Sequence, residues 1–323
     1  MKVLGKLAVV LASCAAISPA GAASAAFSDD AALDPVALDR WWDFTRPVES
    51  EARFRAELER LPPTSAARLE LLTQIARAQG LDRRFDAANA TLDQVAKKMS
   101  GRPGRVAVRY LLERGRVYNS SGAPEKAVPL FGDALERARA AKEDFLAIDA
   151  AHMLGIAAPS EQRLKWNLEA VAMTEQTQDA RSKRWLASLY NNVGWTYHDR
   201  GDYTKALDYF ERALPLREAR GDPANVRVAW WAIARAYRSL GRYDDALAIQ
   251  RRLLEEMIAA NAPDGYVYEE LGELLLARGE AKEARAQFAR AYELLSADAG
   301  FAVAEPKRLA RMRELAGASV TSP

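Results

Sequence analysis

The sequence predicts an all-helical chain built from repeated helix pairs. Its 323 residues are rich in alanine, leucine, arginine and glutamate, which favour helices. No run of alternating valine, isoleucine and threonine indicates a half-buried strand. A hydrophobic content of 49% and a charged content of 28% are typical of a folded globular protein. The helix pairs follow from a spacing of small and aromatic residues that recurs along the chain.

The first 26 residues have the pattern of an export signal. Two lysines precede the apolar stretch LAVVLASCAAISPAGA, and AASAA then offers a small-x-small cleavage site near Ala25 or Ala26. The apolar stretch is short and broken by proline and glycine, and no later stretch approaches the roughly 18 apolar residues of a membrane span. We therefore expect an exported chain, soluble after cleavage, in the periplasm or outside the cell.

The motif LASC, which ends at Cys14, leaves a second interpretation open. It resembles the lipobox of bacterial lipoproteins, in which the cysteine becomes the lipidated first residue. Cleavage near Ala26 would instead leave a mature chain without cysteine, and so without disulfide or thiol chemistry. Either cleavage removes Lys2 and Lys6 and leaves equal numbers of basic and acidic residues, so we expect no nucleic-acid partner.

A recurring spacing of small and aromatic residues is the strongest feature of the chain. In YNNVGWTYHDRGDYTKALDYFERAL, residues 190–214, the residues Gly, Tyr, Gly, Tyr, Ala, Phe and Ala stand at offsets 0, 3, 7, 9, 12, 16 and 19. The same spacing, in whole or in part, starts at Gly115, Ala234 and Gly272. Two divergent copies start at Thr73 and Gly155, and successive copies lie 38 to 42 residues apart.

This spacing resembles the tetratricopeptide repeat, a unit of two antiparallel helices that is about 34 residues long. Small residues let the two helices approach, and large residues fill the remaining space. The resemblance implies a right-handed superhelical solenoid of about six helix pairs. The expected repeats are residues 65–100, 108–141, 144–177, 187–220, 227–260 and 265–298.

The segments that flank the repeat array, 65–298, are expected to cap it. Residues 27–64 predict two short helices split at Pro47, and the aromatic residues that precede this proline should pack on the first repeat. Residues 299–323 predict a capping helix followed by a frayed tail.

No catalytic arrangement is visible in the sequence. It has no glycine-rich phosphate loop, no GxSxG and no HExxH. The two histidines, His152 and His198, are too few for a zinc site in a chain without mature cysteine. We therefore expect no cofactor and no metal, and an enzyme that uses the two histidines is the remote alternative.

In tetratricopeptide repeat proteins the first helix of each pair faces a concave groove, and the resemblance assigns residues of this chain to that groove. They include tryptophans and arginines, the composition of binding hot spots. The expected partner-binding residues are Arg116, Asn119, His152, Asn191, Trp195, His198, Trp231, Arg235, Arg238, Glu269 and Glu273. The alternative for the two tryptophans is packing between neighbouring first helices, with the arginines only shielding them.

The sequence therefore predicts a non-catalytic scaffold or adaptor of the cell envelope that binds a protein or peptide in its groove. The alternative is a component of an envelope assembly machine that is lipid-anchored at Cys14. The identity of the partner does not follow from the sequence, because this fold is reused for many functions.

Overall fold

The computed structural model of the protein describes residues 33–99 and 104–317. Every element of regular secondary structure in these ranges is a helix, which confirms the predicted fold class. The predicted signal peptide with Cys14 lies outside the described ranges, as do the cleavage site near Ala25 and Ala26 and the end of the tail.

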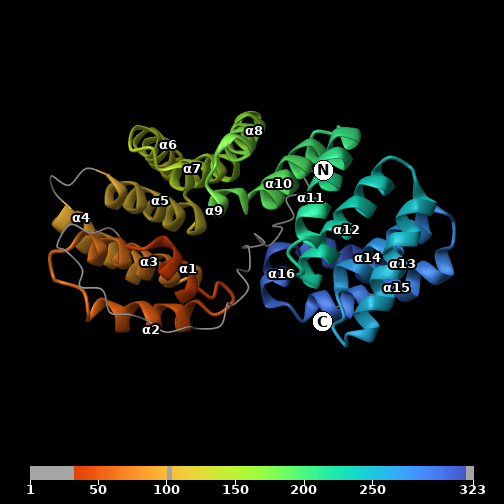
Figure 1. The fold of residues 1–323 in the computed structure, drawn as a ribbon. Coiled ribbons are helices and arrows are strands. Elements are labelled where there is room, and N and C mark those ends of the chain that lie inside the picture. The colour runs from red at the N-terminus through yellow and green to blue at the C-terminus, as the bar shows by residue number, and fades with distance from the viewer. Residues whose placement is uncertain (1–32, 100–103, 318–323) are drawn as a thin grey trace. The chain divides into compact units, whose positions relative to one another are not determined.

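The described chain divides into two units, residues 33–189 and 190–317. Each is described by itself below. Figure 1 shows that both are built from helices that follow one another in adjacent pairs.

The unit of residues 33–189 contains three helix pairs, α3/α4, α5/α6 and α7/α8, with short helices before and after them. Its helices are α1 (Pro35–Trp41), α2 (Pro47–Leu58), α3 (Ala66–Leu81), α4 (Phe85–Met99), α5 (Arg105–Ser120), α6 (Pro124–Ala140), α7 (Asp144–Ala157), α8 (Ser160–Gln176) and α9 (Ala180–Lys183). The two helices before α3 are the expected ones, and α9 was not expected. Asp179 directly precedes it, and the carboxylate of Asp179 accepts hydrogen bonds from the backbone amides of Arg181 and Ser182.

The unit of residues 190–317 contains three further helix pairs, α10/α11, α12/α13 and α14/α15. The first residues of α10 belong to the preceding unit. Its helices are α10 (Leu186–Asp199), α11 (Tyr203–Glu218), α12 (Pro223–Ser239), α13 (Tyr243–Ala259), α14 (Gly265–Ala277), α15 (Ala281–Ser296), α16 (Ala299–Ala304) and α17 (Pro306–Leu315). The expected capping helix is α17, which packs on α15. The short helix α16 was not expected.

The small and aromatic residues of the repeat pattern pack against each other within each pair. A Cβ atom at Gly194 would lie 2.4 Å from the ring of Phe210, and a Cβ atom at Gly115 would lie 2.5 Å from the ring of Phe131. Both phenylalanines are almost completely buried. Glycine is therefore required at these positions because the ring of the second helix occupies the space of a side chain on the first helix.

The turn between the two helices of a pair depends on a glycine in the left-handed conformation. Gly201 has φ 80° between α10 and α11, and the amide of Asp202 reaches back to the carbonyl of Tyr197 at 3.0 Å. Such a bond satisfies a carbonyl at the helix end. Arg200, Gly201 and Asp202 are thus part of the turn of the repeat.

Candidate functional site

The first helices of the unit of residues 190–317 carry a continuous row of aromatic rings. The centroids of Trp195 and Trp231 are 5.9 Å apart, those of Trp231 and Tyr266 are 6.3 Å apart, and those of Tyr266 and Phe301 are 5.7 Å apart. These four residues are called the aromatic row below. The first three are half-buried, whereas Phe301 of α16 is buried and closes one end.

Both tryptophans pack on neighbouring residues and still reach solvent. The indole N–H of Trp231 donates to the carbonyl of Tyr266 at 3.2 Å. The ring of Trp195 lies 5.0 Å from that of Phe210, and its indole nitrogen is buried without a hydrogen-bond partner among the described residues. The sequence left two alternatives open for these residues, packing between helices and exposure. Each tryptophan combines both, because one part of its ring is packed and another part is accessible.

His198 lies at the edge of the aromatic row. Its ring centroid is 5.2 Å from that of Trp195, and its Nε2 is 2.9 Å from the hydroxyl of Ser239. The same hydroxyl accepts a hydrogen bond from Arg235 at 2.8 Å. Burial, together with the positive charges of Arg235 and Arg238, lowers the pKa of His198 to about 4. His198 is therefore a neutral, polar neighbour of the indoles at pH 7.

The arginines and glutamates beside the aromatic row neutralise each other. Arg238 forms two hydrogen bonds to Glu270, at 2.5 and 3.1 Å, and the Nε of Arg235 lies 3.7 Å from the same carboxylate. Glu270 was not among the expected site residues. We call the whole set the Arg–Glu ladder: its members are Arg235, Arg238, Glu269, Glu270, Glu273, Arg308 and Arg311.

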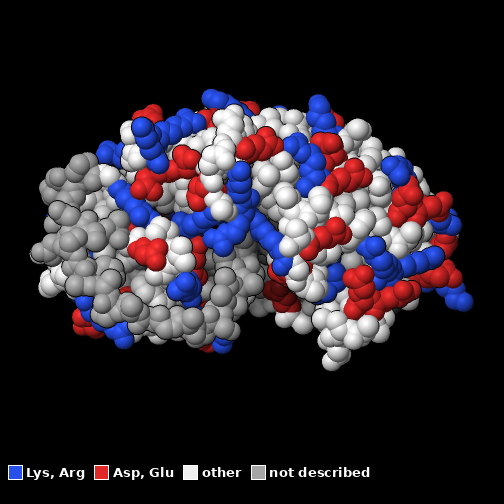
Figure 2. Space-filling view, in the orientation of Figure 1, with Lys and Arg blue, Asp and Glu red and all other residues white. Residues whose placement is uncertain are grey.

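The ladder continues into the capping helix α17. Arg308 donates to Glu269 at 2.6 Å, and Arg311 pairs with Glu273. Burial raises the pKa of Glu269, although Arg308 opposes this shift. Figure 2 shows that basic and acidic side chains are also intermingled over the face that it draws. The aromatic row is thus flanked by paired charges, four arginines with three glutamates.

The other expected site residues lie in different surroundings. Asn191 is buried within α10, and Asn119 is half-buried near the end of α5. Arg116 and His152 belong to a buried network on the first helices of residues 33–189. The structure therefore does not bring all eleven expected residues into one site.

The buried network on α3, α5 and α7 consists of charged groups that pair with each other. Arg116 donates to Glu113 at 2.7 Å and also pairs with Asp149 on α7. Burial opposes the charge of Arg116, but the two acids raise its pKa above the ordinary value. Burial lowers the pKa of the nearby Arg77 to about 10. We call this surface, formed by α3, α5, α7 and α9, the covered face.

His152 lies at one side of the covered face, with its ring centroid 5.2 Å from that of Trp185. Burial lowers its pKa to about 4, although Asp149 opposes this shift. His152 is only 7% exposed. A partner on the outside of the molecule therefore cannot contact it without a rearrangement.

The residues between α1 and α2 cover this face. The indole N–H of Trp42 donates to Gln74 of α3 at 3.1 Å, and the ring of Phe44 stacks on that of Trp42 at 4.5 Å. The guanidinium of Arg77 lies 5.2 Å from the centroid of Phe44. The expected packing of these aromatic residues on the first repeat is present. Asp39, in the preceding helix α1, contacts Arg181 of α9.

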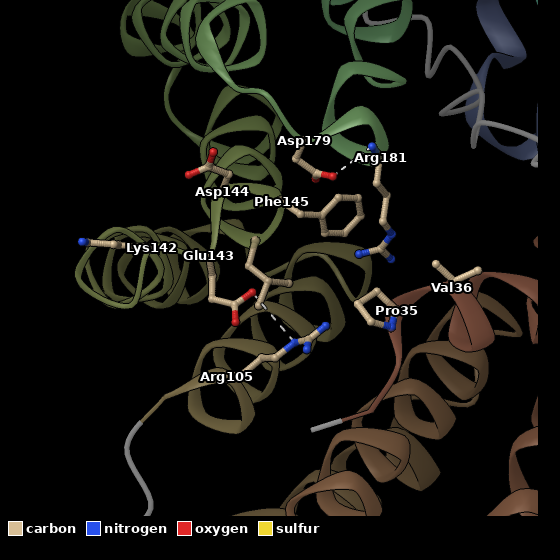
Figure 3. Close-up of a pocket in the computed structure, with 10 residues that line it drawn as sticks. Pro35, Val36, Arg105, Lys142, Glu143, Asp144, Phe145, Asp179 and Arg181 are labelled. Atoms are coloured by element: carbon tan, nitrogen blue, oxygen red, sulfur yellow. Dashed lines mark hydrogen bonds and ion pairs between the residues drawn. The ribbon is translucent and has the colours of Figure 1, made fainter. Parts of the chain in front are cut away.

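A pocket of about 370 Å³ lies beside α1 within the same unit (Figure 3). Pro35 and Val36 line one side of it, and the guanidinium of Arg181, stacked 3.5 Å above the ring of Phe145, lies near them. Arg105 enters it with its Nε 3.9 Å from Glu143. The lining contains both signs of charge and so does not define a ligand by itself.

The described residues offer no constellation for metal chemistry. Within residues 33–99 and 104–317 no group of three or more His, Cys, Asp and Glu side chains could hold a metal ion. None of the helices in this part of the chain is long and apolar enough to cross a bilayer.

Two segments of the chain match family models described as tetratricopeptide repeat, residues 164–219 and 228–256. The chain contains tetratricopeptide repeats. No curated protein sequence matches it. The repeat pattern recognised in the sequence is therefore confirmed, although the models cover only part of the six helix pairs.

Several solved structures share the fold at low sequence identity. A tetratricopeptide repeat protein from Parabacteroides merdae is 18% identical, with a TM-score of 0.51 over 87% of this chain and 97% of that one. The apo form of RapI is 14% identical, with a TM-score of 0.58 over 78% and 96%. NprR, solved in complex with its cognate peptide NprX, is 15% identical, with a TM-score of 0.55 over 85% and 82%. At these identities the likeness concerns the fold.

Proposed function

We propose that this tetratricopeptide repeat chain is a non-catalytic scaffold of the cell envelope, and that a protein or peptide binds to its aromatic row. The observation that carries the proposal is the half-buried position of Trp195, Trp231 and Tyr266 on three successive first helices, which leaves part of each ring accessible. Large aromatic rings that combine apolar area with few rotatable bonds are frequent anchors of protein interfaces. NprR, which shares the fold, was solved in complex with its cognate peptide NprX, so a peptide partner is compatible with this fold.

The surroundings of the aromatic row favour an apolar or aromatic partner segment. The arginines beside it already pair with glutamates, and His198 is neutral at pH 7. A charged partner would have to break these pairs, and a broken buried pair leaves an unpaired charge at a high cost in free energy. An apolar side chain instead covers indole surface and leaves the ladder intact.

The test is partner capture from envelope extract with the double variant Trp195→Ala/Trp231→Ala. We expect it to lose proteins that the wild-type chain captures. The matched control is Trp230→Ala, because Trp230 is also half-buried on α12 but its ring lies under Arg252 of α13. An unchanged set of partners in the double variant, with helicity preserved, would exclude the aromatic row as the binding surface.

The assignment to the envelope is supported by the signal pattern of residues 1–26. The mass of the mature N-terminus tests it. A chain that begins at Ala26 or Phe27 supports a freely soluble exported protein, a lipidated Cys14 supports the anchored alternative, and an uncleaved Met1 contradicts both.

A further inference from the structure

We infer that residues 39–44, DRWWDF, are a built-in ligand of the covered face, and that a partner segment with a carboxylate and aromatic rings can displace them. This inference does not depend on binding at the aromatic row. It rests on two contact sites within residues 33–189, one for a carboxylate and one for an indole.

The carboxylate site is formed by two arginines after the third repeat, Arg181 in α9 and Arg184 directly after it. Asp39 accepts hydrogen bonds from the Nε and Nη2 of Arg181 at 2.8 and 2.7 Å, and from Arg184 at 3.0 Å. Arg181 is positioned independently of Asp39 because its guanidinium lies 3.5 Å above the ring of Phe145 (Figure 3). Such a two-bond arrangement recognises carboxylate geometry specifically. It joins residues that are 142 positions apart in the chain.

The indole site is formed by side chains of α2 and α3. The amide nitrogen of Gln74 donates to Thr73 at 3.2 Å, which leaves the amide oxygen to accept the indole N–H of Trp42. Phe54 of α2 meets the same indole edge to face at 4.9 Å. The guanidinium of Arg77 lies 5.7 Å from the Trp42 centroid. These groups together specify an aromatic ring that carries a hydrogen-bond donor.

The helix that carries Asp39 is short and is anchored in the core of the unit through Leu38. It spans only Pro35–Trp41, and Leu38 is its one buried residue. Val36, by contrast, is 54% exposed. An isolated helix of this length is unstable in water, so its order depends on the contacts that the segment makes with the face. Loss of the Asp39 contact should therefore release the segment without removing core residues of α3, α5 or α7.

The charge of the face favours an acidic replacement. Three guanidinium nitrogens of this face are buried without a hydrogen-bond partner among the described residues: the Nε of Arg77, the Nε of Arg105 and the Nη2 of Arg109. Glu70 Oε1 and Glu113 Oε2 are buried without hydrogen-bond partners among the described residues as well. The preference for an acid therefore comes from Arg181 and Arg184, whose acceptor Asp39 supplies. A competing segment must bring its own carboxylate, because otherwise Arg181 would lose a bidentate acceptor.

The experiment measures binding of a fluorescent peptide of residues 34–46 to three full mature chains: wild type, Asp39→Asn and Asp43→Asn. Asp43→Asn is the matched control, because it removes the same charge from the same segment, but the carboxylate of Asp43 bonds to Thr45 and Arg46 rather than to the arginines of α9. We expect at least tenfold tighter binding to Asp39→Asn than to the other two chains. A peptide that itself carries Asp39→Asn should not bind tightly to any of them.

Hydrogen exchange provides the second measurement. In Asp39→Asn we expect faster exchange in residues 35–44 and unchanged exchange in α3, α5 and α7. Equal peptide affinity for the three chains would overturn the inference. So would a loss of protection in α3, α5 and α7 of Asp39→Asn, because the segment would then be a structural part of the unit rather than a replaceable ligand.

Discussion

The two units use the same helix pair but carry different chemistry on their first helices. In residues 33–189 these helices bury paired charges, such as Arg116 with Asp149, and the chain's own residues 39–44 contact Gln74 of α3 and Arg181 of α9. In residues 190–317 the equivalent helices carry half-buried aromatic rings. The comparison teaches that repeat position alone does not make a binding surface. What matters is whether the chain itself supplies the groups that satisfy that surface.

The largest expected difference concerns ion pairs. Asp149→Ala should destabilise the protein by about 3–5 kcal/mol, because it leaves Arg116 as a buried charge without one of its acids. Glu273→Ala should cost about 1 kcal/mol or less, because its partner Arg311 is 46% exposed. Urea unfolding of the two variants measures both values. Equal losses would remove the distinction between a buried and a partly exposed network.

The next prediction concerns the packing that the two units share. Gly115→Ala and Gly194→Ala should each destabilise by about 1–3 kcal/mol, because the added Cβ would overlap the ring of the second helix. Gly132→Ala on α6 is the control, since its Cβ meets no atom within 4 Å and alanine favours the helix. We expect the control to be neutral or stabilising in thermal unfolding. A destabilised Gly132→Ala would mean that glycine is needed for another reason.

One position of residues 190–317 departs from the packing rule. Gln250 occupies the place that Phe210 and Phe288 hold in the neighbouring pairs, and both ends of its amide are buried without partners among the described residues. Gln250→Leu should stabilise the protein by about 1 kcal/mol, since it removes an unsatisfied polar group. The exposed Gln176→Leu on α8 should have no such effect. Denaturant midpoints compare them, and a loss of stability in Gln250→Leu would show that the amide has a partner.

The smallest effect is the pH dependence from one histidine in each unit. The pKa values of His152 and His198 are lowered to about 4, so the unfolded chain binds more protons between pH 4 and 6.5. Stability should fall as the pH drops through this window and should not depend on the histidines above it. His152→Gln and His198→Gln should each remove on the order of 1 kcal/mol of the difference between pH 7 and pH 5. An unchanged pH profile in both variants would contradict the lowered pKa values.

Much of the fold follows from the sequence because its causes are local. The spacing between Gly194 and Phe210 predicts that this glycine faces this ring, and the structure confirms the contact. The short helices α9 and α16 have too few residues for a periodic pattern, so their presence depends on capping groups and tertiary contacts.

The candidate site follows from the sequence only in part. The contact of Trp195 with Trp231 joins expected site residues on successive first helices. The ion pair of Glu270 with Arg238 and the bond of Asp39 to Arg181 join side chains that no spacing rule connects. Exposure was also beyond the sequence for His152, because the ring that packs against it belongs to Trp185, which no spacing rule connects to it.

Photo-crosslinking tests the contrast between the two units most directly. A photoreactive phenylalanine derivative replaces either Trp231 or Asn119 in the full chain, two positions that are both half-buried on first helices. In cells that produce the protein, we predict crosslinks to a partner from position 231 that do not require release of residues 39–44, and none from position 119 while these residues occupy the covered face. Crosslinks from position 119 with none from position 231 would contradict the account, because the unit with the covered face would then be the one that binds.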